Sequence, residues 1–227
     1  MRRLPGVVVL GALLAAAPLH AQGTGWQNMW FWGAQVGVSA YKTPTTGTSI
    51  QLALDVGAHW LITGKRMGLY LAYDQLFYPN GPSTAPGNPT SQITDPTSGT
   101  GVRDVQFDQG RYIQGDLLAI PLNGPLQIYV GAGFTIQNIT DAVPMGSFAT
   151  PDDQAASQAL VNDAASRAFL NFMGGFQLLL QSRFTVFGTY EFIPSASNFL
   201  ISSQQHVFSG GVRIALSGRR EDVAIDR

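Results

Sequence analysis

The stretch Leu126–Gln137 alternates apolar residues with small or polar ones, and the alternation has no break. Because successive side chains of a β-strand point to opposite faces, one face of this strand is wholly apolar and the other is small or polar. The apolar face consists of Leu126, Ile128, Val130, Ala132, Phe134 and Ile136. No other feature constrains the fold of this chain as strongly.

Further segments follow the same two-residue period. The clearest is Ser49–Ile62, whose strict alternation excludes an amphipathic helix. The longest is Val102–Ile120, whose first half carries two Arg and two Asp and is too charged to contact lipid. We interpret that half as a continuation of the strand beyond a membrane. The other strand candidates are Met29–Tyr41, Met67–Tyr78, Ala168–Gln181, Phe184–Phe192 and a last strand from about Gln204 to Leu216.

Charge is scarce in this chain. Charged residues make up 12% of it, against about a quarter in ordinary soluble domains, while the hydrophobic fraction of 45% is unremarkable. This combination predicts an outer face that meets something other than water. The chain has no Cys, which excludes disulfides and thiol chemistry, and its formal net charge of −1 gives no support for nucleic-acid binding.

The connections between the strand candidates alternate in length. An antiparallel meander places alternate connections at opposite ends, and bacterial outer-membrane barrels have short periplasmic turns and longer outer loops. No later segment approaches the length of a membrane helix, so a chain that spans a membrane must close into a barrel. The sequence predicts an all-β, antiparallel up-and-down transmembrane β-barrel of about eight strands. Its tight turns are Thr63–Arg66, Pro121–Pro125 and Gln181–Arg183, and its long loops are residues 79–101 and 138–167.

The first residues have the pattern of a secretory signal. Arg2 and Arg3 precede an apolar stretch, and Ala21 is a small residue at the expected cleavage point. Loss of residues 1–21 removes these two of the 13 basic residues and none of the 14 acidic ones, so the formal charge moves from −1 to −3. We expect a signal peptide at 1–21, the barrel at 22–216 and a polar C-terminal tail at 217–227.

A short helix is predicted inside the second long loop. Thr150 fits the N-cap position, Pro151 the first helical position, and Asp152 and Asp153 complement the positive end of the helix dipole. The Ala-rich run that follows extends the expected helix to about Ala165.

Three local sequences, YVGAG at Tyr129–Gly133, LLAIPL at Leu117–Leu122 and FSGGVRIAL at Phe208–Leu216, match a known family loosely. From about Gln27 to Leu216 the chain resembles the small eight-stranded outer-membrane barrels, the group that includes the OmpA transmembrane domain and OmpX. The resemblance implies a monomer inserted by the barrel-assembly machinery. Such barrels usually end at an aromatic residue that this machinery reads, whereas here a polar tail follows Leu216.

The expected barrel predicts the positions of two sets of side chains. Outward aromatic residues should form girdles at both membrane interfaces. The girdle residues are Trp30, Trp32, Trp60 and Phe184 near the periplasmic rim, and Tyr73, Phe77, Phe134, Tyr190, Phe192 and Phe208 toward the outer rim. An eight-stranded barrel is wide enough only for side chains to fill it, so inward charges must be paired or hydrated. The expected inward polar residues are Asp55, His59, Asp74, Asp116, Glu191 and Arg213, with Glu191 and Arg213 as a candidate pair on neighbouring strands.

No catalytic, metal or cofactor site is predicted. A nucleophilic enzyme needs a base, a nucleophile and an orienting acid within reach. Of the three His, His20 leaves with the signal, and neither His59 nor His206 has a convincing partner set. No cluster has metal-ligand spacing, and no Gly-rich stretch precedes a helix as a phosphate-binding loop requires.

Recognition commonly resides in loops carried on a rigid scaffold, so residues 79–101 and 138–167 are the expected contact surface for an extracellular partner. We predict a protein embedded in the outer-membrane lipids of a Gram-negative-type bacterium, with a filled lumen and a structural, envelope-integrity or surface-interaction role. Two alternatives stay open at this point. One is a narrow gated channel for small solutes, and the other is a soluble exported lipid-binding barrel, whose outer face would need more charge.

Overall fold

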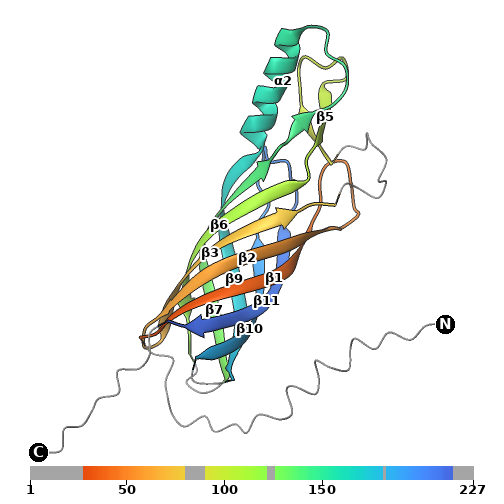
Figure 1. The fold of residues 1–227 in the computed structure, drawn as a ribbon. Helices are drawn as coiled ribbons and strands as arrows, with labels where there is room; N and C mark the ends of the chain where they lie inside the picture. The colour runs from red at the N-terminus through yellow and green to blue at the C-terminus, as the bar shows by residue number, and fades with distance from the viewer. Residues whose placement is uncertain (1–27, 80–89, 122–125, 181–182, 217–227) are drawn as a thin grey trace, which may run out of the picture.

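Eight antiparallel strands close into a barrel (Figure 1). The computed structural model describes residues 28–79, 90–121, 126–180 and 183–216. Around the barrel the order is β1-β11-β10-β9-β7-β6-β3-β2, so each strand pairs with the next barrel strand along the chain and β11 closes on β1. The predicted up-and-down barrel is confirmed. Its strands are β1 (Trp30–Tyr41), β2 (Gln51–Thr63), β3 (Met67–Phe77), β6 (Gln109–Ala119), β7 (Leu126–Thr140), β9 (Ser166–Leu179), β10 (Phe184–Ile193) and β11 (Gln205–Ala215).

The two-residue period separates an apolar outer face from the side chains that point into the barrel. In β7, Val130 is 55% exposed, whereas its neighbour Tyr129 is 1% exposed. The same alternation follows the other barrel strands, and most of the large exposed side chains are Leu, Ile, Val and aromatic residues. The barrel thus exposes the face that a soluble protein would bury.

The two ends of the barrel differ. At one end, here called the turn end, the amide of Gly64 donates to the carbonyl of Met67 at 2.7 Å to close a tight turn. The first and last barrel strands also begin and end there, with Trp32 opposite Ile214. Most of the other two predicted turns, the expected signal peptide at 1–21 and the tail at 217–227 lie outside the described residues.

At the opposite end, the loop end, a second sheet and a helix extend beyond the barrel (Figure 1). Strands β4 (Ser91–Thr94), β5 (Val102–Gln106) and β8 (Val143–Pro144) form a sheet in the order β4-β5-β8, and α2 (Pro151–Ala164) packs on it. The predicted helix is confirmed. We call residues 90–108 and 141–165 the loop-end subdomain.

The prediction of one continuous strand over Val102–Ile120 is wrong. The chain leaves the barrel wall at Phe107 and Asp108, so its charged first half belongs to β5 in the separate sheet. The Phe107 ring is buried edge-on against Tyr78, with 5.1 Å between ring centroids. The Thr90 hydroxyl binds both the amide and the carbonyl of Phe107, at 3.2 and 3.1 Å. These contacts replace ladder hydrogen bonds and turn the chain away from the barrel.

Two apolar clusters of buried residues lie toward the two ends of the barrel. The turn-end cluster consists of Phe31, Leu61, Tyr70, Ala72, Leu118, Ile120, Tyr129, Met173 and Ala215. The loop-end cluster joins barrel residues such as Leu76 and Ile193 to Phe107 and Val161 of the subdomain and to Leu200 and Ile201 of the β10–β11 connection.

Among the described residues, no helix is long and apolar enough to cross a membrane.

Candidate functional site

The loop-end subdomain is assembled from two connections that lie far apart in the sequence. β5 pairs with β4 on one side, and on the other side Val105 and Gln106 pair with Pro144 and Val143 of β8. The amide of Met145 extends this second ladder with a 2.8 Å hydrogen bond to the carbonyl of Asp104. The described parts of the two long loops predicted as a contact surface therefore form one folded unit.

Helix α2 follows from its local sequence. Thr150 is the N-cap, and its hydroxyl accepts a hydrogen bond from the amide of Asp153 at 3.2 Å. The Asp153 carboxylate accepts one from the amide of Thr150 at 3.1 Å, which completes a capping box. Buried Ser157, Val161 and Ala164 share one helical face and fix which side of the helix packs on the subdomain.

The subdomain is fastened to the barrel by backbone and side-chain hydrogen bonds. The amide of Leu200 donates to the carbonyl of Ala164 at 3.1 Å, and the Ser91 hydroxyl donates to the carbonyl of Leu200 at 2.6 Å. The amide of Ile139, near the end of β7, donates to the carbonyl of Ala165 at 2.8 Å. The connection between β10 and β11 is thus held against both β4 and α2.

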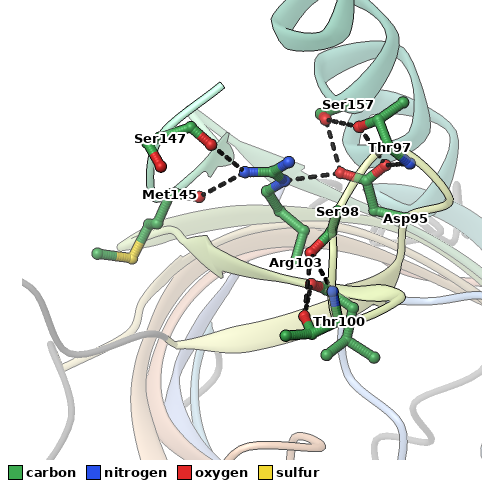
Figure 2. Close-up of polar contacts among 9 residues, drawn as sticks. Asp95, Thr97, Ser98, Thr100, Arg103, Met145, Ser147 and Ser157 are labelled. Carbon is green, nitrogen blue, oxygen red and sulfur yellow. Dashed lines mark hydrogen bonds and ion pairs between the residues drawn. The ribbon is translucent and has the colours of Figure 1, made fainter. Parts of the chain in front are cut away.

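A buried ion pair lies at the centre of the subdomain (Figure 2). The Nε atom of Arg103 donates to Oδ2 of Asp95 at 2.6 Å, and the two side chains are 7% and 0% exposed. Ser157 donates its hydroxyl to the same oxygen at 2.6 Å. Thr97 donates both its amide, at 2.9 Å, and its hydroxyl, at 2.7 Å, to Oδ1. These four residues form the charge lock of the subdomain.

The charge lock also positions the segment that follows β8. Nη1 of Arg103 donates to the carbonyls of Met145 and Ser147, at 3.3 and 3.1 Å. The guanidinium lies over the Phe148 ring, 4.3 Å from its centroid, in a cation–π contact. One Arg side chain therefore connects β5, the Asp95 turn and the segment 145–148 that leads into α2.

Electrostatics at Asp95 agree with this geometry. Burial by itself raises the pKa of the Asp95 carboxyl, but hydrogen bonds from Ser157, Arg103 and Thr97 outweigh burial and hold the pKa well below its usual range. Asp95 is therefore ionised at neutral pH, which keeps the ion pair with Arg103 intact.

An open groove of about 680 Å³ lies beside the charge lock. Its polar lining comes from the β4–β5 hairpin and from Ser147, and its apolar lining includes Val102, Met145 and Phe148. This volume is within the range of small-molecule sites. The polar lining residues are Gln92, Thr97, Ser98, Thr100, Arg103, Asp104 and Ser147.

The six inward polar residues named from the sequence lie elsewhere, inside the barrel, and all are buried. Asp74 accepts a 2.6 Å hydrogen bond from Gln35, and Asp116 one of 2.7 Å from Gln114. Glu191 accepts hydrogen bonds from Asn171 and Thr135, at 3.0 and 3.2 Å. Asp55 is 1% exposed.

The predicted Glu191–Arg213 pair is wrong. Arg213 donates to Nε2 of His59 at 2.7 Å and to Oε1 of Gln177, and it lies 4.0 Å from the centroid of the Phe187 ring. The register explains the error. Arg213 is opposite Thr185, six residues before Glu191 on β10, which is about 20 Å along a strand.

The aromatic residues named from the sequence lie on the outer face. Trp30, Trp32, Trp60 and Phe184 are exposed near the turn end, where Trp32 pairs with Trp60. Toward the loop end, Tyr190 and His206 stack with 6.1 Å between ring centroids, and the Tyr190 hydroxyl is 2.8 Å from Nδ1 of His206. Tyr73, Phe77, Phe134 and Phe208 are exposed as well.

Sequence reasoning missed the charge lock and the groove. The residues involved are common loop residues, and nothing in their spacing joins Asp95 to Ser157. The only available signal was the pair of charges Arg103 and Asp104 in a segment that otherwise alternates like a strand. In the described part of the chain, no group of three or more His, Asp or Glu side chains is placed to hold a metal ion.

No protein-family model matches the chain, and no curated protein matches it in sequence. Among solved structures it is similar to Neisserial surface protein A, with a TM-score of 0.54 and 11% identity over 82% of this chain and 96% of that one. It also aligns with Ail, the attachment invasion locus protein of Yersinia pestis, at a TM-score of 0.46 and 10% identity over 83% and 99% of the two chains. The first of these likenesses shows the fold. The chain has the fold of the small eight-stranded outer-membrane barrels that its sequence resembles.

Proposed function

We propose that the protein is a surface-recognition protein of the outer membrane of a Gram-negative-type bacterium, in which a filled barrel carries the loop-end subdomain into the medium. The observation that carries this proposal is the joining of two distant loops into one unit by the charge lock, with an open groove beside it. A rigid scaffold that presents a preformed loop surface is a common arrangement for binding.

The membrane location is supported by the outer face of the barrel. Exposed Leu, Ile, Val and aromatic residues surround it, and a surface of this kind is stable in lipid and not in water. We also propose that the signal expected at 1–21 directs export, that the barrel-assembly machinery inserts the protein, and that the protein is a monomer. An envelope-integrity role for the barrel itself is compatible with the same location.

A filled lumen is supported by the packing inside the barrel. The turn-end and loop-end clusters lie at opposite ends, and the hydrogen-bonded polar side chains lie between them. Tyr112, Gln205, Gln137 and Tyr78 form one continuous chain of hydrogen bonds of 2.6 to 2.8 Å across the interior. This packing favours a scaffold over the narrow channel that the sequence left open.

The same packing disfavours a soluble lipid-binding barrel, because such a protein needs an apolar cavity inside and charge outside. An enzymatic role has little support. His206, at the loop end of the outer face, contacts the rings of Tyr190 and Phe192, whereas an acid–base pair would need a carboxylate beside it.

Adhesion by expressing cells tests the proposed function. Cells that display the natural protein are compared with cells in which residues 91–106 are replaced by a Gly-Ser linker, on epithelial monolayers and on layers of other bacteria. We expect adhesion to at least one surface and its loss in the linker variant. Heat-modifiable gel migration must show that both barrels assemble. Equal adhesion by the two strains would contradict the proposal.

A further inference from the structure

We infer that the groove of the loop-end subdomain binds an uncharged oligosaccharide. This inference rests on the proposed recognition function and names its ligand class. The groove is open, about 680 Å³ in volume, and lined by hydroxyl, amide and carboxylate groups together with a few apolar side chains. Four observations support this ligand class.

The lining carries little charge. It contains one cation, Arg103, whose charge is neutralised by Asp95 behind it, and one anion, Asp104. The Asp104 carboxylate accepts a 2.8 Å hydrogen bond from Gln92 through Oδ1. A single negative charge therefore remains in the lining, which offers no free cation to an anionic ligand and only one carboxylate to a cationic one, and so suits an uncharged polar ligand.

Two charged side chains of the lining, Asp104 and Arg103, can each form a further hydrogen bond. Oδ2 of Asp104 and Nη2 of Arg103 have no hydrogen-bond partner among the described residues. The first is an acceptor and the second a donor. A sugar hydroxyl both donates and accepts, so different hydroxyls of one oligosaccharide can satisfy the two groups.

The remaining lining also matches a sugar. The hydroxyls of Ser98 and Thr100 form a 3.0 Å hydrogen bond with each other on the exposed hairpin, and that of Thr100 donates to the carbonyl of Val102 at 3.1 Å, so both oxygens keep a lone pair that can accept from a ligand hydroxyl. Phe148 and Met145 provide apolar surface for the C–H face of a sugar ring. The groove is also preorganised, since Arg103 holds the carbonyls of Met145 and Ser147 and the cap of α2 fixes the next residues.

The surroundings disfavour a polyanion. The loop-end subdomain contains seven Asp and one Arg, a formal charge of −6. The seven acids are Asp95, Asp104, Asp108, Asp141, Asp152, Asp153 and Asp163. Like charge on this scale repels sulfated or phosphorylated chains at ordinary ionic strength. A basic peptide would be attracted by the same surroundings, but inside the groove it would find only one carboxylate, that of Asp104, to pair with.

Calorimetric titration of the full-length protein in lipid nanodiscs tests the inference. The probes are uncharged tri- to hexasaccharides of the glucan, mannan and N-acetylglucosamine types, a sulfated oligosaccharide, and a peptide of alternating Lys and Arg. We expect saturable binding of at least one uncharged sugar, with an affinity that is unchanged between about 50 mM and about 500 mM NaCl because no ion pair forms.

Variants separate the groove from the rest of the surface. Asp104→Ala and Thr100→Val should each weaken binding by about tenfold or more, because each leaves a ligand hydroxyl without its partner. The matched control is Asp141→Asn, which removes one charge from an exposed residue of the same subdomain outside the groove and should leave the affinity unchanged. Asn also tolerates the positive φ of 58° at this position.

The outcomes are distinct. Salt-sensitive binding of the sulfated sugar or of the peptide, with no binding of any uncharged sugar, overturns the inference. Binding of an uncharged sugar that Asp104→Ala and Thr100→Val do not weaken overturns it as well. If cells adhere through residues 91–106 but the protein binds none of the uncharged sugars, the ligand class is wrong and the proposed function stands. If the linker variant adheres normally, the proposed function fails.

Discussion

Asp95 and Ser157 lie 62 positions apart in the chain, yet the Ser157 hydroxyl donates a 2.6 Å hydrogen bond to Oδ2 of Asp95. The same oxygen accepts the Nε hydrogen of Arg103 at 2.6 Å. One buried carboxylate oxygen therefore joins the β4–β5 hairpin to α2.

Substitution Asp95→Ala should destabilise the loop-end subdomain and spare the barrel. It leaves the Arg103 guanidinium buried without its counter-charge, which costs about 3–5 kcal/mol. Hydrogen exchange should show lost protection in residues 91–106 and 151–164, while barrel strands keep theirs. Asp163→Ala is the control, since its 3.4 Å pair with Arg167 is solvent-exposed and contributes less than about 1 kcal/mol. Equal loss of protection in the barrel strands would contradict this prediction.

A fall in pH should destabilise the loop-end subdomain, because the ionised Asp95 carboxylate stabilises it. Hydrogen bonds hold its folded-state pKa below the value of about 3.9 in an unfolded chain. Its contribution to stability is therefore complete above the unfolded pKa and is lost as the pH falls through the folded pKa. Exchange protection of the subdomain should stay constant from neutral pH to about pH 5 and then decline. In Asp95→Asn this decline should be smaller; an identical decline would show that other groups cause it.

The barrel could be predicted from the sequence because the residue pattern that determines it lies within each strand. The two-residue period within a strand, as in Ser49–Ile62, identifies the side chains that face outward. Tight turns such as Thr63–Arg66 separate one strand from the next. The start of α2 was predictable for the same reason, since Thr150 and Asp153 form a capping box within four residues.

The subdomain and the lumen partners were not predictable, because they depend on how distant segments are placed. β4 has only four residues and follows a stretch rich in Pro and Gly, so no period marks it. The stagger between β10 and β11 puts Arg213 opposite Thr185 and separates it from Glu191. Register of this kind is set by the closed barrel as a whole, and alternation within one strand carries no information about it.

Substitution Val130→Arg should destabilise the barrel in lipid. Val130 is 55% exposed on the outer face and is the fifth residue of the fifteen-residue strand β7. A charge on the lipid face near the bilayer midplane costs about 2–4 kcal/mol. Val130→Leu is the matched control and should be mild. Denaturant titration in lipid vesicles measures both variants. If Val130→Arg were as stable as Val130→Leu, the outer face would not contact lipid.

Substitution Arg213→Ala should lower stability without opening a pore. Arg213 is 0% exposed and donates to His59 and Gln177. Its removal leaves two buried acceptors without a donor, at about 1–3 kcal/mol each. Because we propose a filled lumen with the turn-end and loop-end clusters at its two ends, neither the natural protein nor the variant should conduct in planar bilayers.

Arg183→Ala, at an exposed residue at the turn end, is the control for stability and should leave the denaturation midpoint unchanged. Discrete current steps in Arg213→Ala would contradict the filled lumen, because they would mean that this one side chain blocks an existing path. A silent variant with a lower midpoint would instead mean that Arg213 acts by packing and hydrogen bonding within a closed interior. Single-channel recording and denaturant titration of the same preparations therefore decide between a gate and a structural residue.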